Sequence, residues 1–349
     1  MNVEFFLGAN SGTGFYSLYD EFCRGKNDYL YLIKAGPGGG KSGFMRRIAA
    51  AANERGLDTE AILCSGDPSS LDAVYIPELG IGFMDATAPH AAEPEEFAYS
   101  SSYVNLGAFC ERIFDERLAE YTAGYRQMYS VAYSYLAAAG KLKTAAIPQL
   151  LTPEMLEKAR LRAKSAVDRE IGKRNFHGKP GRVKNRFIRC ISCLGELALN
   201  ESVEKLCKRI CRVDDRYGLE QAYLHQVLER TTALGVDAIA CRSPLCPELL
   251  DAVLVPERSI AFAASSAAST PEVYRSVRLD DMVSRTAPKR LRQEHKLMLR
   301  QERELVLSAQ KWLARAKELH DELERVYNPH VDFASLNALA DGMIAELFG

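Results

Sequence analysis

The sequence predicts an α/β protein that contains one fold twice, each copy being a parallel sheet flanked by helices and followed by long helices. An apolar strand, a glycine-rich loop and a helix follow one another over residues 29–52. A shift of 179 residues lays the second half of the chain over the first. Each half ends in a long helical stretch, and in the second half the apolar residues recur every three or four positions.

Length and composition set the broad class. The chain has 349 residues, of which 47% are hydrophobic, so it is long enough for two domains and apolar enough for real cores. A formal net charge of −1 gives no overall field that would favour nucleic acid or a membrane. We find no apolar stretch of bilayer-spanning length and no signal-peptide pattern, so we expect a cytoplasmic protein with no membrane partner.

Nine cysteines are present, and an odd number in a long chain argues against a disulfide scaffold. Cys190 and Cys193 form a C-x-x-C pair of the kind that can share a zinc ion. The later cysteines are not spaced as a second such pair, so buried free thiols are the favoured interpretation. These later cysteines are Cys207, Cys211, Cys241 and Cys246.

The first predicted strand covers residues 29–33, where aromatic and branched side chains follow one another without a polar break. Residues 43–52 are rich in alanine and predict a helix that ends near Gly56. Two further strands are predicted at residues 61–64 and 81–84, and each has an aspartate close to its carboxyl end.

The loop between the first strand and the helix reads A-G-P-G-G-G-K-S over residues 35–42, a Walker A pattern with alanine at the usual first glycine. Glycines let backbone N–H groups turn inward around phosphate oxygens, and the helix N-terminus adds partial positive charge. Lys41 would reach the β- and γ-phosphates, and the Ser42 hydroxyl would ligate Mg²⁺. The residues expected around the phosphates are Gly36, Pro37, Gly38, Gly39, Gly40, Lys41, Ser42 and Gly43.

A metal ion held by Ser42 needs an acid nearby, and two aspartates qualify. Asp85 ends the strand at 81–84 and is the favoured metal-side acid, because ligands bind at the carboxyl ends of parallel strands. Asp67 is the second candidate, and either residue could instead cap a turn. Together with Asp67, His90 is a candidate for orienting the attacking group. The predicted metal ligands are therefore Ser42 and Asp85.

The internal repeat separates structural positions from chemical ones. Residues such as Asp72 and Pro77 recur in the second half as Asp251 and Pro256, so we interpret them as structural. The chemical residues do not recur: Lys41, Ser42, Asp67, Asp85 and His90 fall on Glu220, Gln221, Cys246, Ala264 and Ser269. The second loop has a carboxylate, Glu220, at the position of Lys41, where an anionic phosphate would bind. We therefore predict that the second loop holds no nucleotide.

We place an N-terminal copy with its helical extension at residues 1–172, a basic linker at 173–189 and a C-terminal copy at 190–349. The linker has seven Lys and Arg residues and no acid. A solvated linker is the favoured interpretation, with contact to nucleic acid as the alternative. Arg182, Lys184 or Arg186 could also supply a charge-stabilising cation to the first copy.

The long helical stretches are expected at 106–143, 153–171 and 288–327. Packing between the two copies is the favoured interpretation of the last stretch. The alternative is an arm that contacts a protein partner.

Five stretches are spread over nearly the whole chain: F-F-L-G-A-N, Y-L-I-K-A-G-P-G-G-G-K-S, L-D-A-V-Y-I-P, D-A-T-A-P-H and E-L-E-R-V-Y-N-P-H-V-D-F. In these five stretches the chain resembles a family of bacterial two-repeat P-loop ATPases. Members of that family often look as if a working loop is present in each half, and this chain departs from them in its second half. The resemblance implies nucleotide binding and hydrolysis, and it implies no particular substrate.

Together these observations predict a duplicated P-loop NTPase-type fold that binds ATP and Mg²⁺ in the N-terminal copy and hydrolyses ATP slowly. ATP is favoured over GTP because the guanine-reading pattern N-K-x-D does not occur in the sequence. One alternative is a small-molecule or nucleoside kinase. Another is a nucleotide-sensing interaction protein with little turnover, whose long helices report the nucleotide state to a protein partner.

Overall fold

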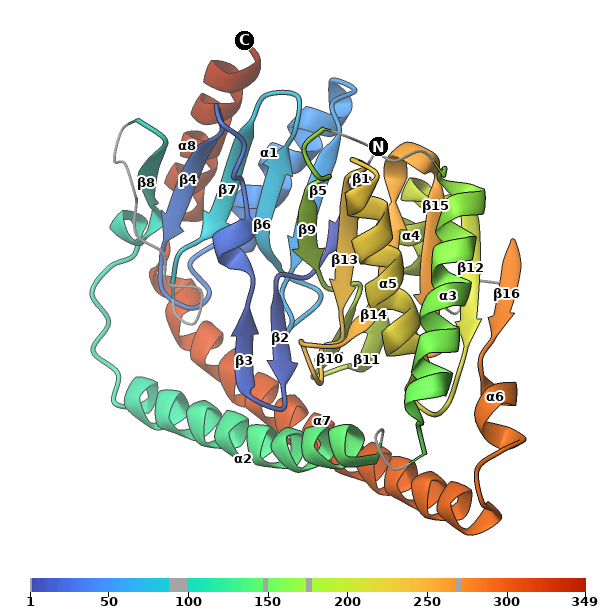
Figure 1. The fold of residues 1–349 in the computed structure, drawn as a ribbon. Coiled ribbons are helices and arrows are strands. Elements are labelled where there is room, and N and C mark those ends of the chain that lie inside the picture. The colour runs from blue at the N-terminus through green and yellow to red at the C-terminus, as the bar shows by residue number, and fades with distance from the viewer. Residues whose placement is uncertain (1, 88–98, 147–149, 174–177, 268–271) are drawn as a thin grey trace.

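The computed structural model describes residues 2–87, 99–146, 150–173, 178–267 and 272–349. The first half forms a six-stranded sheet in the order β1-β5-β6-β7-β4-β8 (Figure 1). Its strands are β1 (Asn2–Phe5), β4 (Tyr29–Lys34), β5 (Thr59–Leu63), β6 (Leu71–Ile76), β7 (Ile81–Asp85) and β8 (Ser101–Asn105). The three strands predicted in this half are thus confirmed as β4, β5 and β7.

The second half repeats this sheet in the order β9-β13-β14-β15-β12-β16. Each strand takes the place of its counterpart in the first sheet, so the predicted duplication is confirmed. The strands are β9 (Val183–Arg186), β12 (Arg209–Asp214), β13 (Ala238–Arg242), β14 (Leu250–Val255), β15 (Ile260–Ala264) and β16 (Arg275–Arg278). Strand β9 lies within the segment 173–189 that the sequence marked as a linker.

The prediction of parallel sheets holds only in part, because both sheets are mixed. Strand β6 runs antiparallel to its neighbours β5 and β7, and β14 does the same between β13 and β15. The other pairs are parallel. The cause is the length of the connections: short turns at 64–70 and 77–80 allow hairpins, whereas a parallel pair needs a longer crossover.

The two halves exchange their trailing helices. Helix α3 (Pro153–Glu170) packs against α5 (Leu219–Ala233) of the second half, and α8 (Phe333–Phe348) packs against α1 (Lys41–Glu54) of the first. Each exchanged helix carries an apolar stripe that joins the core of the half it covers. The first half is therefore completed by a helix from the C-terminal end of the chain.

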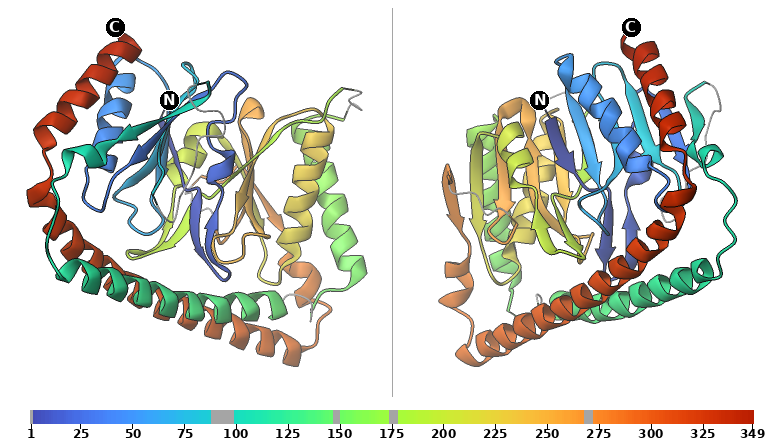
Figure 2. Two further views of the ribbon diagram at one scale, coloured as in Figure 1. Left: turned by 90° about the vertical axis from the view of Figure 1, so that its left-hand side faces the viewer. Right: turned by 180° about the vertical axis from the view of Figure 1, so that it is seen from behind.

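Two long helices join the halves. Helices α2 (Arg117–Ala146) and α7 (Lys289–Tyr327) lie side by side in opposite directions beneath both sheets (Figures 1 and 2). Leu136, Ala309 and Leu313 are buried in their shared contact. The favoured interpretation of this helical stretch, packing between the two copies, is what the structure shows.

The halves also meet at their edge strands. Phe6 and Phe187, each just after the first strand of its half, exchange two backbone hydrogen bonds of 2.9 Å. Beside them the Arg186 Nε lies 2.6 Å from Glu60 Oε1, and both side chains are almost fully buried. Arg182 pairs with Asp237 instead. These two arginines of the predicted linker therefore engage acids away from the glycine loop.

The remaining elements are short. The hairpins β2 (Gly8–Ser11) with β3 (Gly14–Ser17) and β10 (Arg189–Ser192) with β11 (Gly195–Ala198) occupy matching places in the two halves. Two short helices, α4 (Asn200–Leu206) and α6 (Asp280–Ser284), belong to the second half. Within the described part of the chain, the helices are too short or too polar to cross a membrane.

Candidate functional site

The glycine loop connects the carboxyl end of β4 to the first residue of α1. Gly38 and Gly40 have φ angles of +64° and +77°, in the left-handed region that side chains with a Cβ rarely adopt. Gly40 is the residue that precedes α1, so the chain turns sharply into the helix. The glycines at these two positions are therefore required by the backbone itself.

The turn leaves backbone donors free at the start of α1. Gly39 N donates to Gly36 O (3.2 Å) and Phe44 N donates to Gly40 O (2.9 Å), which closes the loop and the first helical turn. The amides of Lys41, Ser42 and Gly43 have no acceptor among the residues that the structure describes. Such a helix end, with unpaired N–H groups and the positive end of the helix dipole, can hold an anion such as phosphate.

Lys41 and Asp85, both predicted from sequence, meet at this loop. Lys41 Nζ donates to Gly36 O (3.0 Å) and Ala35 O (3.2 Å) and lies 3.6 Å from Asp85 Oδ2. The two residues meet because β4 and β7 are neighbouring parallel strands in which Ile33 stands beside Asp85. Asp85 is only 8% exposed, and its Oδ1 accepts hydrogen bonds from the Thr87 amide (2.8 Å) and hydroxyl (2.5 Å).

Ser42 lies on the first turn of α1 and connects it to the sheet. Its Oγ accepts a hydrogen bond from Leu71 N at 2.9 Å. The hydroxyl keeps a second lone pair for a metal ion. An oxygen ligand from Ser42 and a carboxylate from Asp85 are the donor types that Mg²⁺ prefers, so the two residues fit the predicted metal site chemically.

Asp67 lies in the loop between β5 and β6, and its partners are those of a turn residue. Its Oδ1 accepts hydrogen bonds from Ser69 N (3.1 Å) and Ser69 Oγ (2.6 Å), and its Oδ2 lies 3.4 Å from Lys317 Nζ of α7. Burial opposes ionisation of Asp67, but the Ser69 hydrogen bonds and the Lys317 ammonium outweigh it and lower the pKa. The predicted residue His90 lies outside the described residues.

Sequence reasoning gave no role to one part of the site, the segment from the end of α7 to the start of α8. The loop glycines lie close to this segment, as the position of an added Cβ atom shows. On Gly36 the Cβ would lie 3.1 Å from the Tyr327 ring, and on Gly38 it would lie 2.5 Å from the Asn328 amide. On Gly40 it would lie 2.7 Å from the Leu336 side chain. The loop glycines thus also permit this close approach. Tyr327 and Asn328 belong to the stretch E-L-E-R-V-Y-N-P-H-V-D-F, and Leu336 follows it closely. That stretch was the one feature of the sequence that could have indicated a role for this segment.

Among the described residues, one group of side chains has the spacing needed to hold a metal ion. One set of side chains, His320, Asp321 and Glu324 on α7, places its ligand atoms within 4.8 Å of one another. No such grouping includes the cysteines of the described part of the chain, which are all free. Of the six cysteines considered for zinc, all except Cys193 are buried, as the free-thiol interpretation expects.

The corresponding loop of the second half, between β12 and α5, carries acidic side chains where the first loop has glycines and a lysine. Gly218, with φ +95°, precedes α5 as Gly40 precedes α1. The Asp215 carboxylate accepts hydrogen bonds from Tyr217 N (3.2 Å) and Glu220 N (3.0 Å). Gln221 exchanges two hydrogen bonds with the backbone of Leu250, where Ser42 in the first half makes one with Leu71. One amide of the loop and one amide of the first helical turn are therefore bonded to a side chain of the same loop.

Glu220 stands where the first copy has Lys41. Burial and the neighbouring Asp215 carboxylate both raise the pKa of Glu220 well above its ordinary value. Its Oε2 is buried and has no hydrogen-bond partner among the described residues. Glu220 therefore leaves this position without the ammonium group with which Lys41 could attract a phosphate.

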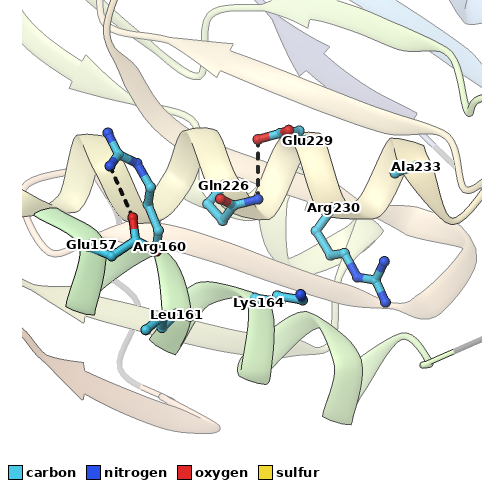
Figure 3. Close-up of a pocket in the computed structure, with 8 residues that line it drawn as sticks. All are labelled: Glu157, Arg160, Leu161, Lys164, Gln226, Glu229, Arg230 and Ala233. Carbon is cyan, nitrogen blue, oxygen red and sulfur yellow. Dashed lines mark hydrogen bonds and ion pairs between the residues drawn. The ribbon is translucent and has the colours of Figure 1, made fainter.

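A groove on the outer surface of the second half is the other concavity we considered. It has a volume of about 320 Å³ and lies between α3 and α5 (Figure 3). Its charged side chains are largely paired, since Arg160 contacts Glu157, Gln226 contacts Glu229 and Arg230 contacts Asp168. It offers neither a helix end with free amides nor a buried acid, so the glycine loop is the better candidate site.

Comparisons with protein families, curated proteins and solved structures found no match to this chain. The case for a function therefore rests on the geometry of the glycine loop.

Proposed function

We propose that the protein binds ATP at the glycine loop of its N-terminal half and hydrolyses it slowly in the presence of Mg²⁺. The observation that carries the proposal is the convergence of Lys41, Asp85 and the free amides of α1 at the end of β4. The C-terminal half has the same backbone frame, but Asp215 and Glu220 replace the groups that would attract an anion.

The residues have separate roles in this proposal. The amides of residues 41–43 and the Lys41 ammonium bind the phosphates and stabilise the negative charge that develops on the transferred group. Ser42 and Asp85 would hold Mg²⁺, which supplies charge neutralisation on the phosphate oxygens when bound. Lys41 leaves the carbonyls of Ala35 and Gly36 to reach the phosphates. Asp67 and His90 are the sequence candidates for orienting the attacker, and Asp67 already faces Lys317.

A second candidate function is favoured by the position of α7. This helix begins in the second half and ends against the glycine loop of the first, a position from which its C-terminal turn would respond to what occupies the loop. A protein that binds ATP with little turnover and reports its nucleotide state through α2 and α7 fits the same site. Tight binding with negligible hydrolysis would favour this function.

The test measures ATP binding and Mg²⁺-dependent phosphate release for wild type, Lys41→Ala and Asp85→Ala. Glu220→Gln serves as a control, because it changes the corresponding position of the second loop. Slow release by wild type and by the control, lost in the other two variants, supports an ATPase. Binding without release supports the sensing function, and release of ADP only with an added acceptor would point to a kinase. Absence of binding to wild type would overturn both proposals.

A further inference from the structure

Asn328 is the first residue after α7, and its side chain contacts the glycine loop directly. In the amide orientation that satisfies its neighbours, Nδ2 donates to Gly38 O at 3.1 Å and to Glu324 O at 3.3 Å. The second of these bonds ties Asn328 to the last turn of its own helix. The first joins the C-terminal half of the chain to the loop of the N-terminal half.

This contact fixes one peptide group of the loop from both sides. The peptide between Gly38 and Gly39 has its carbonyl held by Asn328 and its N–H bonded to Gly36 O at 3.2 Å. Gly38 has a left-handed backbone that a glycine could readily leave, because glycine populates both signs of φ. Without the bond from Asn328, the loop would sample other conformations and its amides would no longer be held in one arrangement.

We propose that Asn328 is a positioning residue of the nucleotide site, supplied to the first half by the second. Its carboxamide holds the Gly38–Gly39 peptide and so preorganises the loop amides that receive the phosphates. The proposal rests on the proposed function of the loop in binding ATP. It makes the passage of α7 from the second half to the first a requirement of the site, because the loop is complete only when the end of α7 is in place.

Because Asn328 is exposed, its role in positioning the loop can be tested separately from any contribution to the stability of the fold. The side chain lies at the surface, so its hydrogen bonds contribute little to global stability. The apolar contacts of the same segment come from Tyr327 and Leu336, which pack against Gly36 and Gly40. Removal of the carboxamide should therefore change the loop and leave the fold intact.

The first experiment measures the dissociation constants of ATP and ADP for wild type, Asn328→Ala and Asn328→Asp. Asn337→Ala is the matched control, since Asn337 is an exposed asparagine on α8 whose side chain makes no hydrogen bond with the described residues. We expect Asn328→Ala to weaken both nucleotides by about tenfold, the effect of one hydrogen bond that preorganises a site. Asn328→Asp should weaken them further, because a carboxylate cannot donate to Gly38 O and repels phosphate.

The second experiment measures hydrogen exchange without nucleotide, so it does not depend on ATP binding. In Asn328→Ala the hydrogen-bonded amides within residues 35–44, those of Gly39 and Phe44, should exchange faster than in wild type, while those of Tyr217 and Glu220 in the second loop are unchanged. If wild type binds no ATP but this exchange difference appears, the proposed function fails and the positioning role stands. Unchanged exchange at 35–44, or nucleotide affinities equal to wild type, would overturn the positioning role.

Discussion

The two loops of this chain share a backbone frame and differ in what fills it. Each follows an interior strand of its sheet and contains a left-handed glycine directly before a helix. Ser42 bonds the first residue of β6, and Gln221 bonds the first residue of β14. In the first loop the amides at the helix end are free and Lys41 stands beside them. In the second, the Asp215 carboxylate accepts from two loop amides.

The difference shows two ways in which one backbone frame can treat the amides before a helix. Amides at a helix N-terminus need acceptors, and a phosphate or a carboxylate can serve. The second loop supplies its own carboxylate from Asp215, so it keeps its shape without a bound anion. The first loop has no carboxylate over residues 35–40, so its helix-end amides stay open to an external anion. This contrast is the basis for assigning nucleotide binding to one half of the molecule.

The largest expected effect comes from Lys41→Ala. Loss of a group that stabilises transition-state charge should lower the rate of ATP hydrolysis by about 100- to 1,000-fold. Glu220→Ala, the matched change in the second loop, should leave the rate unchanged, because our proposal assigns no nucleotide to that loop. The measurement is phosphate release at saturating ATP, and an equal loss in both variants would erase the distinction between the loops.

Arg186→Ala tests whether the two halves depend on each other. Removing one partner of the buried pair with Glu60 leaves an uncompensated charge at the interface, which costs about 3–5 kcal/mol of unfolding free energy. Arg182→Ala is the control, since its pair with Asp237 is exposed and should contribute less than about 1 kcal/mol. Urea unfolding of the full chain measures both, and equal stabilities of the two variants would show that the Arg186–Glu60 pair does not couple the halves.

Gly38→Ala tests whether the first loop needs glycine for its backbone and for the approach of α7. A left-handed alanine costs about 1–2 kcal/mol, and its Cβ would also stand 2.5 Å from the Asn328 amide. Gly56→Ala is the control, because Gly56 has a similar φ of +77° with open space around it. Thermal unfolding and ATP affinity should suffer more in Gly38→Ala, and equal losses would argue against the close approach of α7.

The smallest effect concerns pH and the second loop. The folded state raises the pKa of Glu220 above its ordinary value of 4.5, so the native chain binds this proton more tightly than the unfolded chain does. The stabilisation is fully present below the ordinary pKa and is lost as the pH rises through the folded pKa. Glu220→Gln stays neutral, so its stability relative to wild type should increase with pH above about 4.5. Denaturant unfolding at several pH values checks the trend, and a difference that is independent of pH would contradict it.

The sequence predicted the local elements of the site well, because strand, glycine loop and helix are adjacent in the chain. It also brought Lys41 and Asp85 together correctly, since neighbouring parallel strands align their carboxyl ends. It missed the mixed character of the sheets, although the short connections before and after β6 were visible. The packing of α8 against α1 and the contact of Asn328 with Gly38 link residues nearly 300 positions apart, and no local pattern carries that information.

The residue-by-residue alignment of the two loops could be made only from the structure. A shift of 179 residues places Gly40 on Leu219, but the glycine that precedes the second helix is Gly218. The helices keep the register of the shift, as the buried pairs Phe44 with Tyr223 and Ile48 with Val227 show. The second helix therefore starts one residue earlier, which the sequence comparison alone did not reveal.

The most direct test of the central claim is calorimetric titration of the full chain with ATP and Mg²⁺, which reports the number of nucleotides bound per chain. The two-loop account predicts one ATP per chain, abolished by Lys41→Ala and retained by Glu220→Gln. Two bound nucleotides per chain, or a single one that survives Lys41→Ala, would contradict the assignment of binding to the first loop.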